Sequence, residues 1–110
     1  MRIGIDIVDI DRIKKIVLQT PTYIERMLYM EESASGSIES ICGKIAAKEA
    51  IMKTGFIRPG EWKKIMIKTL DCGAPIVCDD AGLPVSAIQI SISHAHHQAV
   101  AVALYDAPIT

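Results

Sequence analysis

Glu49 occupies an unusual position in the chain, because it falls on an apolar helical face. At about 100° per residue, a helix over residues 37–54 gathers a stripe of apolar side chains on one side, namely Ile38, Ile41, Cys42, Ile45 and Met52. Glu49 falls among them, and Lys53 lies one turn further on, so the two form an i,i+4 pair. Such a pair can be a surface ion pair worth roughly 0.2–0.5 kcal/mol, or part of a functional site. The helix alone leaves both interpretations open.

Asp6 interrupts an apolar strand near the N-terminus. Alternation over residues 2–8 puts Gly4, Asp6 and Val8 on one side. The other side carries Ile3, Ile5 and Ile7. Because both sides are largely apolar, we expect an interior strand. A buried carboxylate normally pairs with a cation, binds a metal or takes up a proton.

His94 ends a third apolar row. It follows three isoleucines that share one face of a predicted strand, Ile88, Ile90 and Ile92. A single histidine at such a place is more often a core or strand-end residue than a ligand. Three ionisable groups on three apolar faces nevertheless favour a functional site, because such groups cluster where chemistry is done.

The elements that must position these residues can be predicted from periodicity and turn residues. We expect a strand over 2–8, a helix over 9–17 capped by Asp9, and a second short helix opened by Thr20-Pro21. A loop over 33–37 precedes the helix over 37–54, which ends before Gly55. Strands over 62–70 and 74–78 form one hairpin, and strands over 88–93 and 98–105 form another. This order predicts an α+β fold, with the N-terminal strand and helices packed on a mainly antiparallel sheet.

Composition limits the possible functions. The 110 residues fit a single domain spanning 1–110, and half of them are hydrophobic. A net charge of −1 gives no support for nucleic acid as a partner. No apolar run approaches the roughly 20 residues of a membrane span, so we expect a cytoplasmic protein. The three cysteines show no disulfide or zinc spacing, and a metal site made by His94, His96 and His97 has little support.

Three motifs carry a resemblance to a known family. They are Gly4-Ile5-Asp6 at the N-terminus, Gly43-Lys44-Ile45-Ala46-Ala47-Lys48-Glu49-Ala50 followed by Lys53, and Ser91-Ile92-Ser93-His94. Together, and in this order, they resemble the holo-[acyl-carrier-protein] synthases, the short branch of the phosphopantetheinyl transferases. The resemblance extends over nearly the whole chain.

The resemblance implies Mg²⁺-dependent transfer of 4′-phosphopantetheine from coenzyme A to a serine of an apo acyl carrier protein, as in fatty acid biosynthesis. Asp6 and Glu49 would then bind Mg²⁺, which prefers oxygen ligands. Lys53 would contact a phosphate and complete the catalytic set. The other residues implied in coenzyme A binding are His94, Lys48 and Lys44. The base that removes the serine proton would be Glu49 or a metal-bound water.

The resemblance also implies partners. Members of this branch assemble as homotrimers with active sites at subunit boundaries, so His94 would face the carboxylates of a neighbouring chain. Arg12 and Arg26 would contact the acidic carrier protein, although each can equally belong to a solvated surface.

The sequence departs from the family pattern in places. Lys44 and Ile45 stand where the family commonly has Arg and an aromatic residue, and the run Leu28-Tyr29-Met30-Glu31-Glu32 lacks the usual Thr. The segments over 33–40 and 54–60 are shorter or less glycine-rich than usual. These departures support an alternative, a degenerate relative that binds coenzyme A or a carrier protein without catalysis.

Overall fold

The structure, a computed structural model, describes residues 1–34 and 36–109. Ser35, inside the predicted loop over 33–37, therefore lies outside the described residues. The elements follow in the order β1 (Arg2–Asp9), α1 (Ile10–Gln19), the 3-10 helix η1 (Ile24–Arg26), α2 (Met30–Ser33), α3 (Ile38–Thr54), the 3-10 helix η2 (Trp62–Lys64), β2 (Ile65–Thr69), β3 (Pro75–Asp79), β4 (Ile88–His94) and β5 (Gln98–Tyr105).

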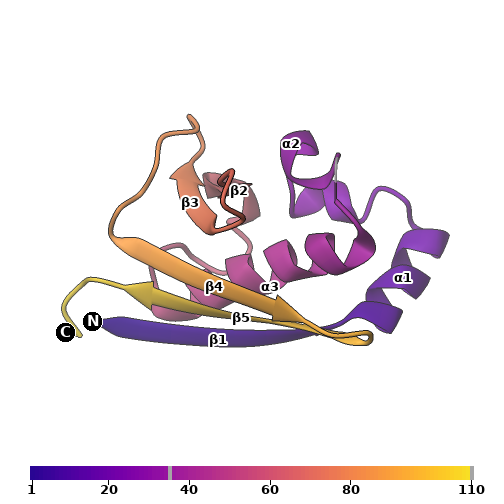
Figure 1. The fold of residues 1–110 in the computed structure, drawn as a ribbon, viewed down its shortest axis with the longest axis horizontal. Helices are drawn as coiled ribbons and strands as arrows, with labels where there is room; N and C mark the ends of the chain where they lie inside the picture. The colour runs from indigo at the N-terminus through magenta and orange to yellow at the C-terminus, as the bar shows by residue number, and fades with distance from the viewer. Residues whose placement is uncertain (35, 110) are drawn as a thin grey trace.

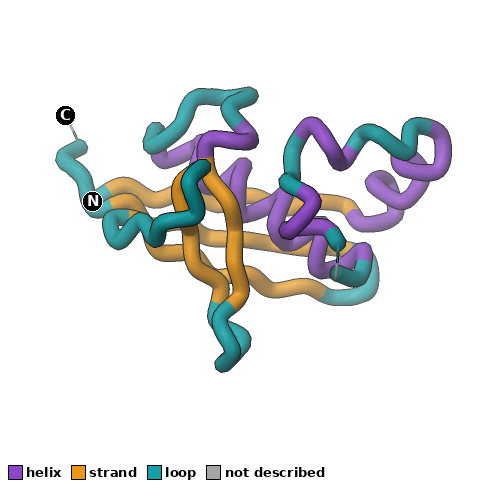
Figure 2. Tube along the Cα trace, turned by 90° about the horizontal axis from the view of Figure 1, so that it is seen from above, coloured by secondary structure: helices purple, strands orange, loops and turns teal. Residues whose placement is uncertain are grey.

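The strands form two antiparallel sheets. β1, β5 and β4 make a three-stranded sheet in that order, and β2 pairs with β3 in a separate hairpin. Figure 1 shows α3 lying along one face of the larger sheet, with β2, β3 and α2 on the other side of the helix. Figure 2 shows the smaller hairpin crossing over the long strands. The predicted α+β class and both predicted hairpins are confirmed.

α3 is the central element of the core. It begins after Ser37, whose hydroxyl accepts a hydrogen bond from the Ser40 N–H at 3.1 Å, and it ends at Gly55 with φ of 84°. Its buried side chains extend around most of the helix: Cys42, Ile45, Ala46, Ala47, Lys48, Ala50, Ile51 and Thr54. The expected one-sided stripe was therefore incomplete, because the sheet covers one side of the helix while α2 and β2 contact another.

β1 is an edge strand with one face uncovered, so within the single chain the prediction of a strand covered on both faces was wrong. Gly4 and Val8 are buried against the helix side, as expected. Ile3, Ile5 and Ile7 on the opposite side are 68%, 57% and 59% exposed in the single chain. The reason is that helices cover only one face of the three-stranded sheet.

Several details of the shorter elements differ from the sequence prediction. The second helix is only the short η1, although Met27 and Leu28 are buried as expected, and α2 forms within a segment for which no helix was predicted. β2 begins at Ile65 rather than Trp62. Met66 was expected on the open side of this strand but is buried, because α2 also contacts β2.

No helix in the described part of the chain has both the length and the apolar character that crossing a membrane requires.

Candidate active site

Gly4 brings β1 into direct contact with α3. A Cβ atom at this position would overlap the carbonyl oxygen of Ala50 and would lie 3.1 Å from Cβ of Lys53. Any other residue would therefore push the strand away from the helix. Asp6 is two residues further along the same face of the strand, so its carboxylate points towards the last turns of α3.

Lys53 and Asp6 form an ion pair at this contact. Lys53 Nζ lies 3.1 Å from Oδ1 of Asp6 and also donates a hydrogen bond to the carbonyl oxygen of Ile5 at 2.8 Å. The Asp6 side chain is 12% exposed, whereas that of Lys53 is 56% exposed. The carboxylate is therefore nearly enclosed while the ammonium group remains accessible to a ligand.

The second oxygen of Asp6 has no partner. Oδ2 is buried and receives no hydrogen bond from the described residues. A buried acceptor left in this state costs free energy, on the order of 1–3 kcal/mol or more for a charged group. Such an atom indicates a place for a bound ion or a polar ligand.

Glu49 adds a second carboxyl group beside Asp6. Burial and the neighbouring carboxylate of Asp6 raise the pKa of Glu49 to about 7, while Lys53 and Arg12 oppose the shift. When both are ionised, these two partly buried carboxylates carry two negative charges against the single positive charge of Lys53. A divalent cation with oxygen preference fits this donor set. In the described part of the chain, no third Asp, Glu, His or Cys joins the pair, so further ligands would be water or substrate oxygens.

Lys48 is not open to a phosphate. Its side chain is 0% exposed, and its three N–H groups donate to Glu32 Oε1, the Met27 carbonyl and the Trp62 carbonyl at 2.8, 2.8 and 2.9 Å. These bonds use its whole donor capacity. Burial also lowers the pKa of Lys48, although Glu32 opposes the shift. Lys48 was predicted to contact a phosphate, but in this placement none of its donors is left for one. No pattern in the sequence pointed to Glu32 as its partner.

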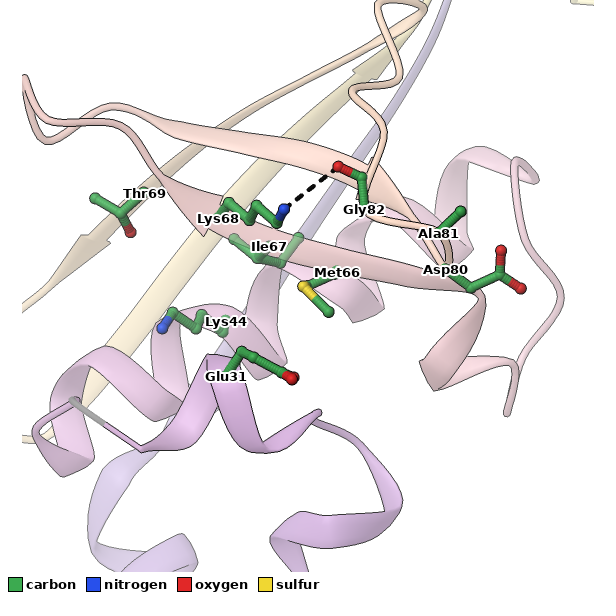
Figure 3. A pocket seen from close by; sticks show the side chains of 9 residues that line it. All are labelled: Glu31, Lys44, Met66, Ile67, Lys68, Thr69, Asp80, Ala81 and Gly82. Atoms are coloured by element: carbon green, nitrogen blue, oxygen red, sulfur yellow. Dashed lines mark hydrogen bonds between the residues drawn. The ribbon is translucent and has the colours of Figure 1, made fainter.

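Lys44 lines a cavity of about 550 Å³. Figure 3 shows Lys44 and Glu31 facing β2 residues across it, with Lys68 bonded to the Gly82 carbonyl. The remaining wall is formed by Met66, Ile67, Thr69, Asp80 and Ala81. Lys44 was predicted from sequence to bind coenzyme A, whereas Lys68 and Thr69, which share its cavity, were not predicted. Lys68 lies on the polar side of the predicted strand, which is normally a solvated face.

His94 lies apart from the carboxylates within one chain. It ends β4, whereas Asp6 is on β1, and β5 runs between these two strands. The exposed His94 pairs with Ala99 in the sheet and lines a surface pocket together with Glu39. His97 is bonded to Asp11 at 2.8 Å instead of joining a histidine cluster. A three-histidine metal site is therefore not formed by these described residues.

Arg12 and Arg26 lie in different surroundings. Arg12 is exposed in the first turn of α1, and its charge acts on Glu49. Arg26, in η1, lines a separate cavity of about 380 Å³ with Trp62, Lys63 and Lys64. Only Arg12 is thus near the paired carboxylates.

Sequence and structure comparisons give consistent relatives. No protein-family model matches the chain. A holo-[acyl-carrier-protein] synthase of Chlorobium chlorochromatii is 38% identical over 118 residues, covering 96% of this chain and 100% of the relative. The synthase of Pelodictyon phaeoclathratiforme is 41% identical over 118 residues and covers 96% of this chain and 98% of its own. The crystal structure of the Helicobacter pylori synthase, in complex with coenzyme A, matches with a TM-score of 0.81 at 32% identity, covering 94% of this chain and 98% of that chain.

Proposed function

Because the chain belongs to the holo-[acyl-carrier-protein] synthase family, we propose that it transfers 4′-phosphopantetheine from coenzyme A to a serine of an apo acyl carrier protein. The second product is adenosine 3′,5′-bisphosphate. In this proposal Asp6 and Glu49 bind Mg²⁺, and Lys53 contacts the pyrophosphate.

One observation supports the metal site above all others. The buried Oδ2 of Asp6 lacks a partner, and the same carboxylate raises the pKa of Glu49. A cation bound between them would satisfy the orphan oxygen and relieve the repulsion between the two carboxylates. When bound, Mg²⁺ neutralises negative charge on the pyrophosphate oxygens.

Lys53 has one donor left for substrate. A lysine ammonium has three N–H groups, and two of them are directed at Asp6 and at the Ile5 carbonyl. The third can meet a phosphate oxygen at the accessible side of the ion pair. Charge placed there before the reaction stabilises the developing charge on the leaving phosphate.

Glu49 is our candidate for the group that accepts the serine proton. Without a bound metal the pKa of Glu49 is raised to about 7, and Mg²⁺ beside it would lower that value. Its place in the site, rather than its pKa, therefore makes Glu49 a candidate base. A carboxylate has two oxygens, so one can bind the metal while the other takes the proton. The competing candidate is a water molecule, which would leave Glu49 with the metal role alone.

The cavity at Lys44 is a suitable place for the nucleotide of coenzyme A. Two lysines, Lys44 and Lys68, and the hydroxyl of Thr69 offer cations and a donor for phosphate groups. The volume of about 550 Å³ is within the usual range for small-molecule sites. Lys48 is left out of this set, because it is buried beneath the cavity wall.

The open face of the three-stranded sheet supports assembly with further copies of the chain. The exposed isoleucines of β1 stand directly opposite apolar residues of β5, giving the cross-strand pairs Ile3–Leu104, Ile5–Val102 and Ile7–Val100. A continuous apolar face of this kind on a small domain normally marks an interface. We propose a homotrimer in which His94 reaches the carboxylates of a neighbouring chain.

Mixed assemblies test this shared site. Asp6→Asn and His94→Ala chains should each be inactive alone, but a refolded mixture should regain part of the wild-type activity. Intact Asp6 and intact His94 can then meet across some subunit boundaries. A mixture that stays inactive, although it forms trimers by mass, would contradict the shared site.

α1 is our candidate for carrier docking. Arg12, Lys14 and Lys15 are exposed on this helix and suit an acidic partner. Arg12→Glu should raise KM for the carrier protein while leaving KM for coenzyme A near its wild-type value. The separate surroundings of Arg26 make it a weaker contributor.

The direct test is a transfer reaction. The protein is incubated with coenzyme A, Mg²⁺ and apo acyl carrier protein, and the carrier is examined by mass spectrometry for phosphopantetheine on its serine. We expect modification with wild type and none after chelation of the metal; Asp71→Asn, in an exposed turn, should behave as wild type. If several apo carriers bind but none is modified, the non-catalytic alternative replaces the enzyme.

A further inference from the structure

Glu32 and Lys48 form a fully buried ion pair on the side of α3 away from β1. Lys48 Nζ and Glu32 Oε1 are 2.8 Å apart, and both side chains are 0% exposed. The carboxylate also accepts a hydrogen bond from the Tyr29 N–H at Oε1 and one from the Ile67 N–H at Oε2, both at 2.8 Å. The pair therefore joins α2, α3 and β2 at one point.

A buried pair of this kind needs a reason other than stability. Moving two charges out of water costs free energy that their attraction rarely exceeds, and apolar replacements of similar volume are often neutral or stabilising. Hydrogen bonds from a charged pair, in contrast with apolar contacts, fix direction as well as distance. The pair is therefore better explained by the positioning of α2, α3 and β2 than by a contribution to the stability of the fold.

The walls of the 550 Å³ cavity are attached to this pair. Ile67, on the β2 wall, donates its N–H to Glu32, and Lys68 is the next residue. Lys44, on the α3 wall, lies one turn before Lys48 and donates to the carbonyl oxygen of Glu32. Glu31 on the α2 wall precedes Glu32. Figure 3 shows Lys44 and Glu31 on one side of the cavity and Ile67 and Lys68 of β2 on the other.

We infer that Glu32 and Lys48 are positioning residues that hold the α2, α3 and β2 walls at the separation the nucleotide of coenzyme A requires. The inference rests on the proposed function of the cavity. Neither residue touches the nucleotide; each acts through Lys44, Ile67 and Lys68. Breaking the pair should therefore change coenzyme A binding selectively.

Two variants test the inference. Glu32→Gln keeps the shape but replaces one acceptor oxygen by an NH₂ group, so the bond to Ile67 or the bond to Lys48 is lost. The double variant Glu32→Leu with Lys48→Met fills the space with apolar groups and should retain most of the stability. In both, Kd and KM for coenzyme A should rise at least tenfold, while kcat and KM for the carrier change less than threefold.

A core variant separates positioning from general destabilisation. Ile13→Val in α1 removes a buried methylene far along the chain from the cavity walls. At a comparable fall in Tm it should leave Kd for coenzyme A unchanged. An equal rise in Kd in this variant would overturn the inference.

The remaining outcomes are also decisive. If the Glu32→Gln variant and the double variant fold and keep the wild-type Kd for coenzyme A, this inference is overturned and the proposed function is unaffected. Failure of both to fold would overturn it too, because the pair would then be a requirement of the fold. If wild type itself neither binds coenzyme A nor transfers from it, the proposed function fails before the variants are compared.

Discussion

The two sides of α3 carry the same chemical groups in opposite states. The side with Asp6, Glu49 and Lys53 is called the open side, because one carboxylate oxygen has no partner and the lysine side chain is half exposed. The side with Glu32 and Lys48 is called the closed side. Both side chains are buried there, and all three lysine donors and both carboxylate oxygens form hydrogen bonds. Unused bonding capacity thus distinguishes a group prepared for a ligand from one that positions the elements around it.

The largest expected effect is on activity, at the open side. Asp6→Asn and Glu49→Gln should each reduce kcat/KM about 10³-fold or more, since each removes a metal-binding charge. The Tm should stay the same or rise, because each change removes repulsion between two carboxylates. Initial rates and thermal melts of the same samples check both parts. A variant that kept near-normal activity would remove its residue from the metal site.

The next effect is on stability, at the closed side. Lys48→Met leaves Glu32 buried without its cation and should lower the free energy of unfolding by about 3–5 kcal/mol. The same replacement at the exposed Lys53 should cost less than about 1 kcal/mol. Urea unfolding of both variants measures the difference. Equal losses at the two lysines would break the distinction between the two sides.

Lys53→Ala should weaken transfer less than removal of a carboxylate. We expect kcat/KM to fall about 10²-fold, the usual effect of losing one charged donor to a reacting phosphate. Steady-state kinetics with varied coenzyme A provides the measurement, and Lys64→Ala, an exposed lysine of η2, is the matched control. An unchanged kcat/KM would show that Lys53 only neutralises Asp6.

The smallest effect is a dependence of stability on pH. The pKa of Glu49 rises from 4.5 in the unfolded chain to about 7 in the folded chain, so the folded chain keeps a proton that the unfolded chain releases. Without divalent ions, stability should therefore fall as pH rises from about 4.5 to about 7. Glu49→Gln should lose this slope, and Mg²⁺ should oppose it at pH 7. Thermal melts across this range check the prediction; an identical slope in Glu49→Gln would contradict it.

Much of the open side was predictable from sequence. Asp6 and Glu49 interrupt regular apolar patterns, and their motifs predicted the family, which the relatives confirm. Their proximity also followed from the motif, while the close packing at Gly4 that produces it became visible only in the structure. The α+β class and the hairpins were predictable because turn residues and alternation are local signals.

The closed side was not predictable by the same means. Lys48 and Glu49 are adjacent charges in one helix, and periodicity cannot tell which of them finds a buried partner 16 residues away. Glu32 stands beside Glu31, and nothing local separates the buried carboxylate from the one that lines a cavity. Alternation in β1 likewise could not reveal that its isoleucine face is left bare by the chain's own helices.

Gly4 sets the distance between β1 and α3 on the open side, and substitution of the charged residues does not change this distance. The distance between β1 and α3 is set there by backbone against backbone, since a Cβ would overlap the Ala50 carbonyl. The spacing of the two carboxylates therefore depends on the absence of a side chain at position 4. Evolution can replace ligands or lysines around this site one at a time, but it has no smaller residue with which to bring the strand closer. The site stands at its minimum width, and any change at position 4 can only widen it.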